Sequence, residues 1–323
     1  MSLPDRAALE AAAAKVHAVF GPTPQFCWPL LCARAAAEVW VKHENHTPIG
    51  AFKVRGGIVH MDRVKQTRPG LAGVVTATRG NHGQSVALAA RAAGLAATVV
   101  VPHGNSVEKN AAMRAQGAAI VEHGDDFQDA YEFARAEADR LGLHFVDSFQ
   151  PDLVEGVGTY ALELFSAVPD IDTVYVPIGL GSGICGTMAA RDALGLRTKV
   201  VGVVAAGAPA YALSFAAGRP VSTNAVDTMA DGVACRVPNA EAFAMIKAGA
   251  ERIVTVDDAA IAAAMRHYFT DTHNVAEGAG AAPLAALLQE RAAMAGRRVA
   301  VILSGGNVDR AVYAPILAAK DAA

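Results

Sequence analysis

The sequence has almost no excess of charge of either sign. Its 323 residues include 28 Lys and Arg against 31 Asp and Glu, which leaves a net charge of −3. This balance provides no basic surface of the kind that binds nucleic acid or an anionic membrane. No uncharged stretch approaches the ~20 residues that a bilayer-spanning helix needs, and the chain does not begin with the basic start and apolar run of a signal peptide. We therefore expect a cytoplasmic protein without nucleic-acid or membrane partners.

Cysteine is also scarce. The four cysteines form no CxxC pair and show no His/Cys spacing typical of a metal site: Cys27, Cys32, Cys185 and Cys235. We expect them to be free, buried thiols, as is usual in a reducing cytosol.

Apolar residues dominate the sequence, at 53% hydrophobic against 18% charged. A chain of 323 residues is too long for most single cores, which suggests two lobes. Short apolar runs alternate with segments typical of helices, and we expect strands at 37–44, 73–78, 96–102, 118–124, 144–148, 172–178, 198–205, 252–256 and 297–304. This alternation predicts an α/β fold of two three-layer α/β/α lobes with parallel sheets and a boundary near 147–152.

A glycine-rich segment, PIGLGSGICG, lies between an expected strand and an expected helix and contains Gly179, Gly181 and Gly183. Backbone amides in such a loop can approach an anion closely, and the helix N-terminus adds partial positive charge. The alternative is a tight strand–helix turn. The acid that would hold a dinucleotide ribose and the lysine of a nucleotide-triphosphate loop are both missing. The loop is therefore predicted to bind a phosphate monoester.

Two more turns follow expected strands, where ligands bind in open α/β sheets. TATRGNHGQS places Thr78, Asn81 and His82 at a helix start, whose amides could hold a carboxylate. Ordinary helix capping is the alternative there. ILSGGNVD places Ser304 at the end of the last strand, where its hydroxyl can donate and accept. A plain turn is the alternative for that segment.

The segment GAFKVRGG sets Lys53 between Phe52 and Val54, with glycines on both sides. Lysine is rarely found among apolar residues unless it forms an ion pair or has a chemical function. Together with the phosphate loop, the asparagine turn and Ser304, it indicates pyridoxal phosphate, with Lys53 as the Schiff-base lysine. Desolvation would ease loss of the ammonium proton and let the amine act later as a base.

These four segments, in this order, resemble those of the serine/threonine dehydratases and serine racemases, tryptophan-synthase-β-like enzymes of fold type II. GAFKVRGG is similar to the family's Ser-Phe-Lys-x-Arg-Gly-Ala, RGNHGQS to its Ser-Gly-Asn-His-x-Gln, GLGSGICG to its phosphate loop and SGGN to its serine turn. The resemblance covers nearly the whole chain. It implies a homodimer with the cofactor in a cleft between a large domain (1–62 and 150–323) and a small domain (71–147).

The resemblance also implies roles for single residues. Lys53 would carry the cofactor and remove the substrate α-proton, with Phe52 packed beside the ring. Asn81 would bond the ring's phenolic oxygen and Ser304 would face the pyridine nitrogen. The remaining contacts would come from the phosphate loop and the substrate-carboxylate turn: Gly179, Leu180, Gly181, Ser182 and Gly183, and Thr78, Arg79, Gly80, Asn81 and His82.

Three features depart from the family's pattern. Arg79 stands where relatives often carry serine or alanine, and arginine cannot act as a base, which disfavours racemisation. Arg79 would contact a substrate carboxylate or polar β-substituent, or else face solvent or pair with Glu155. Residues 204–210 offer no carboxylate for the family's divalent cation, so we expect no metal there. The chain ends too soon after SGGN for a regulatory domain, which favours amino-acid catabolism.

Two acidic residues complete the resemblance. Asp231, in ADGVACRVP, lies in a segment similar to one that lines the family's cofactor pocket. Glu277, in AEGAGAA, lies at an expected helix start, where it would be either a simple N-terminal charge or a catalytic group.

The predicted activity is that of a pyridoxal-phosphate-dependent dehydratase, a lyase that converts a β-hydroxy-α-amino acid such as L-threonine or L-serine to a 2-oxo acid and ammonia. A larger substrate (3-hydroxyaspartate, phenylserine or a hydroxyectoine-derived amino acid) stays open, as does a racemase of the same fold. A non-enzymatic protein that binds a phosphorylated ligand is disfavoured, since a binder needs no nucleophilic lysine.

Overall fold

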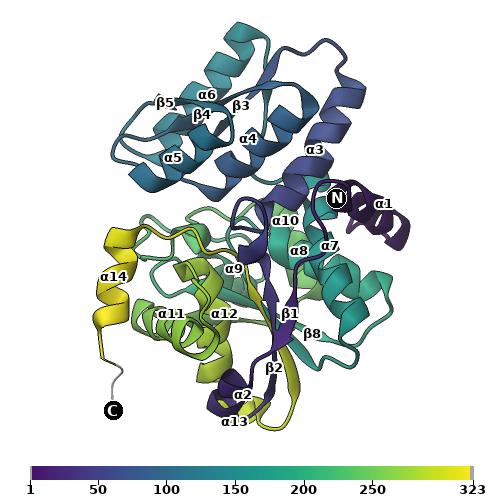
Figure 1. The fold of residues 1–323 in the computed structure, drawn as a ribbon, viewed down its shortest axis with the longest axis vertical. Helices are drawn as coiled ribbons and strands as arrows, with labels where there is room; N and C mark the ends of the chain where they lie inside the picture. Colours follow the sequence, from purple (N-terminus) through teal and green to yellow (C-terminus); the bar gives the residue numbers. More distant parts are fainter. Residues whose placement is uncertain (1, 321–323) are drawn as a thin grey trace.

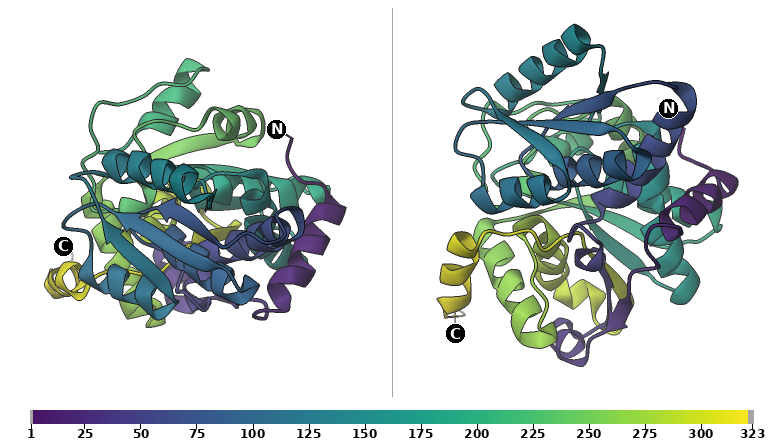
Figure 2. Two further views of the ribbon diagram at one scale, coloured as in Figure 1. Left: turned by 90° about the horizontal axis from the view of Figure 1, so that it is seen from above. Right: turned by 45° about the horizontal axis from the view of Figure 1, so that its top comes forward.

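The computed structural model describes residues 2–320, which form two β-sheets with helices on both faces of each (Figure 1). Within this range no helix is both long and apolar enough to span a bilayer. Figure 2 shows the first and last helices, α1 (Arg6–His17) and α14 (Arg310–Ala318), at opposite sides of the molecule.

The larger sheet has six strands in the order β1-β2-β10-β7-β8-β9. Their bounds are Gln25–Cys27, Glu38–His43, Arg298–Leu303, Thr173–Pro177, Lys199–Ala205 and Arg252–Val256. Only the pair of β1 with β2 is antiparallel. The interior strands are runs of Val, Ile and Ala buried on both faces, as parallel strands between helices must be.

The smaller sheet is wholly parallel, in the order β5-β4-β3-β6. Its strands are Ala118–Glu122, Ala96–Val101, Gly73–Ala77 and His144–Phe145. Helices α4 (Asn81–Ala93) and α5 (Val107–Ala115) cover one face, and α6 (Phe127–Leu141) covers the other. Strands β3, β4 and β5 each lead into a helix that returns over the sheet, as a parallel sheet requires.

The remaining helices cover the larger sheet, and several of them start at a side-chain cap or a proline. Asp5 accepts from the Ala8 amide at the start of α1, and proline is the first residue of α2 and α7. One face carries α2 (Pro29–Ala35), α11 (Asp258–Thr272) and α12 (Gly278–Gln289), and the other carries α1, α7 (Pro151–Ala167), α8 (Ser182–Ala193) and α10 (Ala240–Gly249). Two further helices are α9 (Ala210–Ala217) and α13 (Arg291–Met294).

Helix α3 (Lys53–Thr67) connects the two lobes, here also called layers, that are built around the smaller and the larger sheet. It packs against α4 of the smaller lobe and against α7 of the larger lobe. The contact with α7 is close: a Cβ at Gly156 would overlap the carbonyl oxygen of Arg55. Lys53 is the first residue of this helix, so its position depends on how tightly α3 is held.

The predicted fold class is confirmed, and the expected strands are all present. The elements that were not predicted include β1 and α2, because PTPQF has prolines where a strand was not expected and α2 is only seven residues long. Helices α9 and α10 were not predicted either. The expectation of four buried cysteines was wrong in part, since Cys27 and Cys32 are only half-buried. The exact domain bounds stay a prediction.

Candidate active site

The serine turn and the lysine segment are joined by backbone hydrogen bonds. Gly306 donates to the carbonyl of Gly50 at 2.9 Å and Phe52 donates to the carbonyl of Ser304 at 3.0 Å. The register follows from the sheet, because β10 and β2 are parallel neighbours and the two segments leave their carboxyl ends together. Ser304, which is buried, is thereby held next to Lys53.

The amine of Lys53 has no hydrogen bond or ion pair within residues 2–320. Its Nζ lies 5.0 Å from the centre of the Phe52 ring. Lys53 keeps some exposed surface as a residue, but desolvation of its amine lowers the pKa to about 8. A substantial fraction of the amine is therefore neutral near physiological pH, which suits a nucleophile or a base.

Asn81 is held from both ends of its amide. Its Nδ2 donates to Oε1 of Glu277 at 2.8 Å, and its Oδ1 accepts from Nδ2 of Asn307 at 2.8 Å. Asn307 also donates to the carbonyl of Ile49 at 2.8 Å. Because Asn307 has two donors and uses them on these two oxygens, it fixes which end of Asn81 is the donor.

Glu277 is almost completely buried and does not cap α12, although it precedes the first residue of that helix. Its backbone N–H donates to Gly305 at 3.1 Å. Its Oε2 has no hydrogen-bond partner among the described residues. Burial, and then the nearby Asp231 carboxylate, raise the pKa of Glu277 to about 8. Glu277 is thus a buried acid with a raised pKa and no side-chain cap, which disfavours a simple N-terminal charge, and its role stays a prediction.

The turn before α4 presents a helix N-terminus. The hydroxyl of Thr78 accepts from the amide of Gly80 at 3.0 Å, which shapes the turn, and the first turn of α4 leaves backbone N–H groups without intrahelical acceptors. His82 is buried, and desolvation lowers its pKa to about 3, so its ring is neutral. Its Nε2 lies 3.5 Å from the carbonyl of Val146, so the ring is turned to the protein interior.

Arg79, in the same turn, is exposed and makes no hydrogen bond or ion pair within residues 2–320. The expected alternative of a pair with Glu155 is wrong, because Glu155 pairs with Arg63 at 3.3 Å. Arg79 is therefore available to a ligand.

The glycine loop ends at α8, whose first residue is Ser182. Gly181 has φ 107°, a conformation that only glycine adopts readily, and a Cβ at Gly179 would overlap the carbonyl oxygen of Gly232. Two buried tyrosines hold the loop: Tyr160 donates to the carbonyl of Gly183 at 2.8 Å and Tyr211 to that of Leu180 at 2.9 Å. The loop amides and the α8 N-terminus are therefore arranged to receive an anion.

These features fit pyridoxal phosphate. The amine of Lys53 has no hydrogen bond or ion pair, and the buried Oε2 of Glu277 has no hydrogen-bond partner among the described residues. The loop before α8 packs so closely against its neighbours that a Cβ at its glycines would collide with them. An aldehyde, a polar ring edge and a phosphate would complement these three groups respectively.

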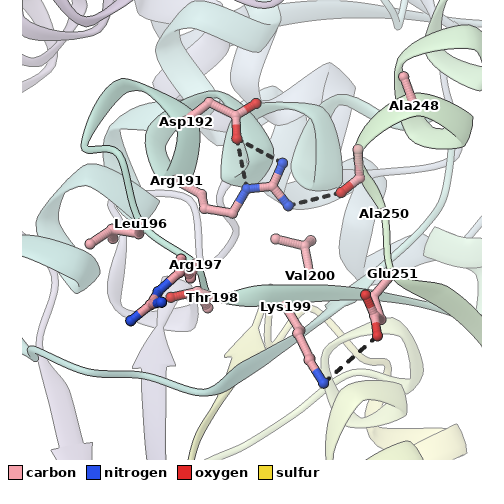
Figure 3. Close-up of a pocket in the computed structure, with 11 residues that line it drawn as sticks. Arg191, Asp192, Leu196, Arg197, Thr198, Lys199, Val200, Ala248, Ala250 and Glu251 are labelled. Carbon is pink, nitrogen blue, oxygen red and sulfur yellow. Dashed lines mark hydrogen bonds and ion pairs between the residues drawn. The ribbon is translucent and has the colours of Figure 1, made fainter.

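A pocket of about 450 Å³ lies elsewhere, at the start of β8 and just before the start of β9 (Figure 3). Its charges are already matched, because Arg191 donates to Asp192 at 2.7 Å and Lys199 lies 3.8 Å from Glu251. Ligands of open α/β sheets bind at the carboxyl ends of strands, and this hollow is at the amino end of β8. It does not compete with the site around Lys53.

The two layers are also tied together beside the site. Lys109, near the start of α5, forms an ion pair with Asp231, and the hydroxyl of Ser106 donates to Asp309 at 2.6 Å. A Cβ at Gly80 would lie 2.8 Å from Cδ of Lys109, so this lysine stands directly against the predicted substrate turn. Nothing in the sequence indicated Lys109 or Ser106, because an inter-layer contact has no local pattern.

The structure thus joins Phe52, Lys53, Asn81 and Ser304 through backbone and side-chain contacts, and it places the glycine loop and the Thr78–His82 turn at helix starts. The roles assigned to these residues stay predictions. Asn307 was missed as a functional residue although it belongs to the quoted SGGN segment. Its only signal was a polar side chain that follows a buried strand.

Comparison with known proteins gives one family. The model of the pyridoxal-phosphate dependent enzyme family matches residues 16–305. The chain is 36% identical over 276 residues to an L-threonine ammonia-lyase of Thermotoga maritima, covering 84% of this chain and 68% of that protein. It is 33% identical over 307 residues to an L-threo-3-hydroxyaspartate ammonia-lyase of a Pseudomonas species, covering 95% and 96%. Maize serine racemase has a similar structure, with a TM-score of 0.92, 27% identity and 97% of each chain covered.

Proposed function

The chain belongs to the family of pyridoxal-phosphate-dependent enzymes, and from this premise we propose that it is an ammonia-lyase for a β-hydroxy-α-amino acid, with L-threonine and L-serine as the first candidates. The products are a 2-oxo acid and ammonia. Membership confirms the cofactor and the fold type expected from the sequence.

One observation carries the proposal: a desolvated lysine without a hydrogen bond or ion pair follows Phe52, whose backbone binds Ser304, and its charge interacts with Glu277, the partner of Asn81. The protein also has a glycine loop at the start of α8. A phosphate-binding protein without catalysis has no use for an amine whose pKa is lowered to about 8. A base with a pKa near the working pH is what removal of an α-proton requires.

Bound pyridoxal phosphate supplies an electron sink that acidifies the α-carbon of an amino acid. The amides of Gly179–Gly183 would hold its phosphate, Asn81 would donate to its phenolic oxygen and Ser304 would face its ring nitrogen. Phe52 would cover one side of the ring. These contacts fix the ring relative to Lys53.

Three further tasks fall to the protein. The free amides at the start of α4 would bind the substrate carboxylate, which the partial positive charge of the helix favours. The neutral amine of Lys53 would take the α-proton. The protonated Glu277 holds Asn81 without placing a negative charge beside the phenolic oxygen.

The test uses purified protein loaded with pyridoxal phosphate and a panel of L-threonine, L-serine and L-threo-3-hydroxyaspartate. We expect 2-oxo acid and ammonia in equal amounts, and covalent trapping of the cofactor on Lys53 by borohydride. Lys53→Ala should lose both trapping and at least ~10³-fold in kcat. A Lys53→Ala protein that still turned over would contradict the proposal.

A second candidate substrate, 3-hydroxyaspartate, is favoured by Arg79. The guanidinium of Arg79 is exposed and makes no hydrogen bond or ion pair in the described part of the chain. Arg79 follows Thr78 in the turn that is predicted to bind the substrate carboxylate. A second substrate carboxylate would suit this cation. If Arg79 selects it, Arg79→Ser should raise KM for 3-hydroxyaspartate at least ~10-fold and leave that for serine nearly unchanged, whereas equal changes for both would rule the role out.

Racemisation stays the alternative of the same fold. It needs a second acid–base group opposite Lys53, and an arginine at position 79 cannot serve. Chiral analysis of serine recovered from D₂O checks this: we expect no D-serine, and substantial D-serine would make the protein a racemase.

Homodimerisation and a cytoplasmic location complete the proposal. The dimer rests on the resemblance alone. Light scattering of the purified protein and fractionation of the source cells would check the two statements.

A further inference from the structure

A pair of thiols lies outside the active site, at the β1 edge of the larger sheet. Cys27 ends β1, Cys32 lies in α2, and their Sγ atoms are 3.4 Å apart. Both are half-buried, whereas Cys185 and Cys235 are buried. We propose that Cys27 and Cys32 form a reversible dithiol–disulfide site that is oxidised by hydroperoxides.

The two sulfurs are not equivalent. Sγ of Cys32 accepts a hydrogen bond from the backbone N–H of Val39 at 3.2 Å and also lies 3.9 Å from the Val39 carbonyl, to which its thiol donates. Burial, and then the contact with Cys32, raise the pKa of the Cys27 thiol to about 12. Cys27 therefore keeps its proton, and Cys32 is the thiol that reacts first, because thiolate is the nucleophilic form.

The oxidation balances with one hydroperoxide. The Cys32 thiolate attacks the peroxide and breaks its O–O bond, which forms a sulfenic acid and, after the leaving oxygen takes a proton, an alcohol or water. Sγ of Cys27 then attacks the sulfenic sulfur, loses its proton and releases water as the S–S bond forms. Two electrons pass from the two thiols to the peroxide, and an external dithiol reverses the change.

The position of the pair makes its state observable. The chain contains two tryptophans, and both flank the pair: Trp28 lies between the cysteines in sequence, and Trp40 is opposite Cys27 in the β1–β2 register. Trp28 also donates to His43 at 3.0 Å. A disulfide at this place draws the end of β1 and the start of α2 together, so the fluorescence of both rings should respond.

The site is also connected to the anchor of α3. Thr23 lies just before β1. Its carbonyl accepts a hydrogen bond from the ammonium of Lys42 at 2.8 Å, and its hydroxyl donates to Glu44 at 2.6 Å. Glu44 in turn binds the guanidinium of Arg55, two residues after Lys53. A change at Cys27 therefore acts on a strand that contacts the charged groups holding the active-site helix.

The experiment treats the reduced chain with one to two equivalents of hydrogen peroxide and follows intact mass, tryptic peptides and tryptophan fluorescence. We expect a mass loss of about 2 Da from the removal of two hydrogens. Because Cys27 and Cys32 lie in one tryptic peptide, residues 16–34, the loss should be found within that peptide as an internal disulfide, and dithiothreitol should restore mass and fluorescence. Cys27→Ser should stop at a sulfenic acid on Cys32 that dimedone captures. Cys235→Ala, the matched control, should still form the disulfide.

Several results would overturn the proposal: no internal disulfide in the tryptic peptide of residues 16–34, a disulfide between two chains, or irreversible oxidation of Cys32 in the wild-type protein. A Cys32→Ser protein that formed sulfenic acid on Cys27 as quickly as Cys27→Ser forms it on Cys32 would overturn the order of attack. If either serine variant fails to fold, peptide mapping of the wild-type protein alone decides the matter.

Discussion

At the residue scale, the site depends on two desolvated groups whose pKa values are shifted in opposite directions from those of free side chains. Desolvation lowers the pKa of Lys53 to about 8 and raises that of Glu277 to about 8. Near neutral pH the amine is partly neutral and the carboxyl keeps its proton. Both shifts have the same cause, because burial disfavours whichever form is charged.

The pKa of Lys53 predicts the pH dependence of cofactor capture. Below about pH 8 the rate at which the apoprotein binds pyridoxal phosphate covalently should rise ~10-fold per pH unit, and it should level off above this pH because the amine is then neutral. Stopped-flow absorbance measures it. The same shift predicts how the stability of the apoprotein depends on pH. The pKa of Lys53 is lower in the folded than in the unfolded protein, so the free energy of unfolding should increase as the pH rises from about 8 toward 10.5. A plateau reached only above about pH 10 would show a solvated amine.

Asn307 gives a second residue-scale prediction. Asn307→Asp keeps the volume but removes both donated hydrogen bonds and places a carboxylate against the oxygens of Asn81 and Ile49. We expect the dissociation constant of pyridoxal phosphate to rise ~10-fold or more, since each lost hydrogen bond contributes roughly 1 kcal/mol. Fluorescence titration of the apoprotein measures it. The control is Asn105→Asp, which loses a bond to Asn110 in the smaller layer and should leave the affinity unchanged.

At the element scale, helix α3 is anchored by a buried charge network. Arg55 donates to Glu44 at 2.7 Å and to Glu163 at 2.7 Å, and Lys42 donates to Glu163 at 2.6 Å. Two cations therefore meet two carboxylates in a buried cluster that joins β2, α3 and α7. Burial raises the pKa of Glu163, but Arg55 and Lys42 lower it more, to about 2, so the carboxylate stays ionised. The network fixes the first turn of α3 and with it the backbone of Lys53.

Removal of the central cation should be costly. Arg55→Met leaves Glu44 and Glu163 with one cation in place of two, and an uncompensated buried charge typically costs about 3–5 kcal/mol. Urea unfolding monitored by circular dichroism measures the free energy of unfolding. Arg6→Met removes an exposed pair with Glu10 and should change it by less than ~0.5 kcal/mol. Equal losses in the two variants would show that the network does not hold α3.

At the scale of the whole molecule, the two lobes contact each other through α3 and through the Lys109–Asp231 and Ser106–Asp309 pairs, among others. In Figure 1 the α5 end of the smaller layer stands over the larger one near α14. The lysine side chain is 12% exposed and the aspartate side chain 41%, so this pair is partly solvated. Such a contact sets how readily the layers separate more than how stable each layer is.

We therefore expect Lys109→Met to change the free energy of unfolding by less than ~1 kcal/mol and to increase amide hydrogen exchange severalfold at the starts of α5 and α14. Hydrogen-exchange mass spectrometry reads both regions. Lys199→Met, which breaks the pair with Glu251 at the amino end of β8, should leave this exchange unchanged. Unaltered exchange in Lys109→Met would show that the Lys109–Asp231 pair does not hold the two lobes together.

The sequence by itself determined the α/β architecture, because apolar strands and helices alternate locally. It also indicated Lys53, the glycine loop and the two polar turns as functional segments, through the types of residue placed at strand ends. Tertiary structure alone decided how these groups are held. Asn81 is 196 residues from Glu277 and 226 from Asn307, yet contacts both. The Cys27–Cys32 contact joins residues only five apart, but it too depends on elements, β1 and α2, that are too short to leave a periodic signal. Contacts between distant segments arise from packing, so no local pattern records them.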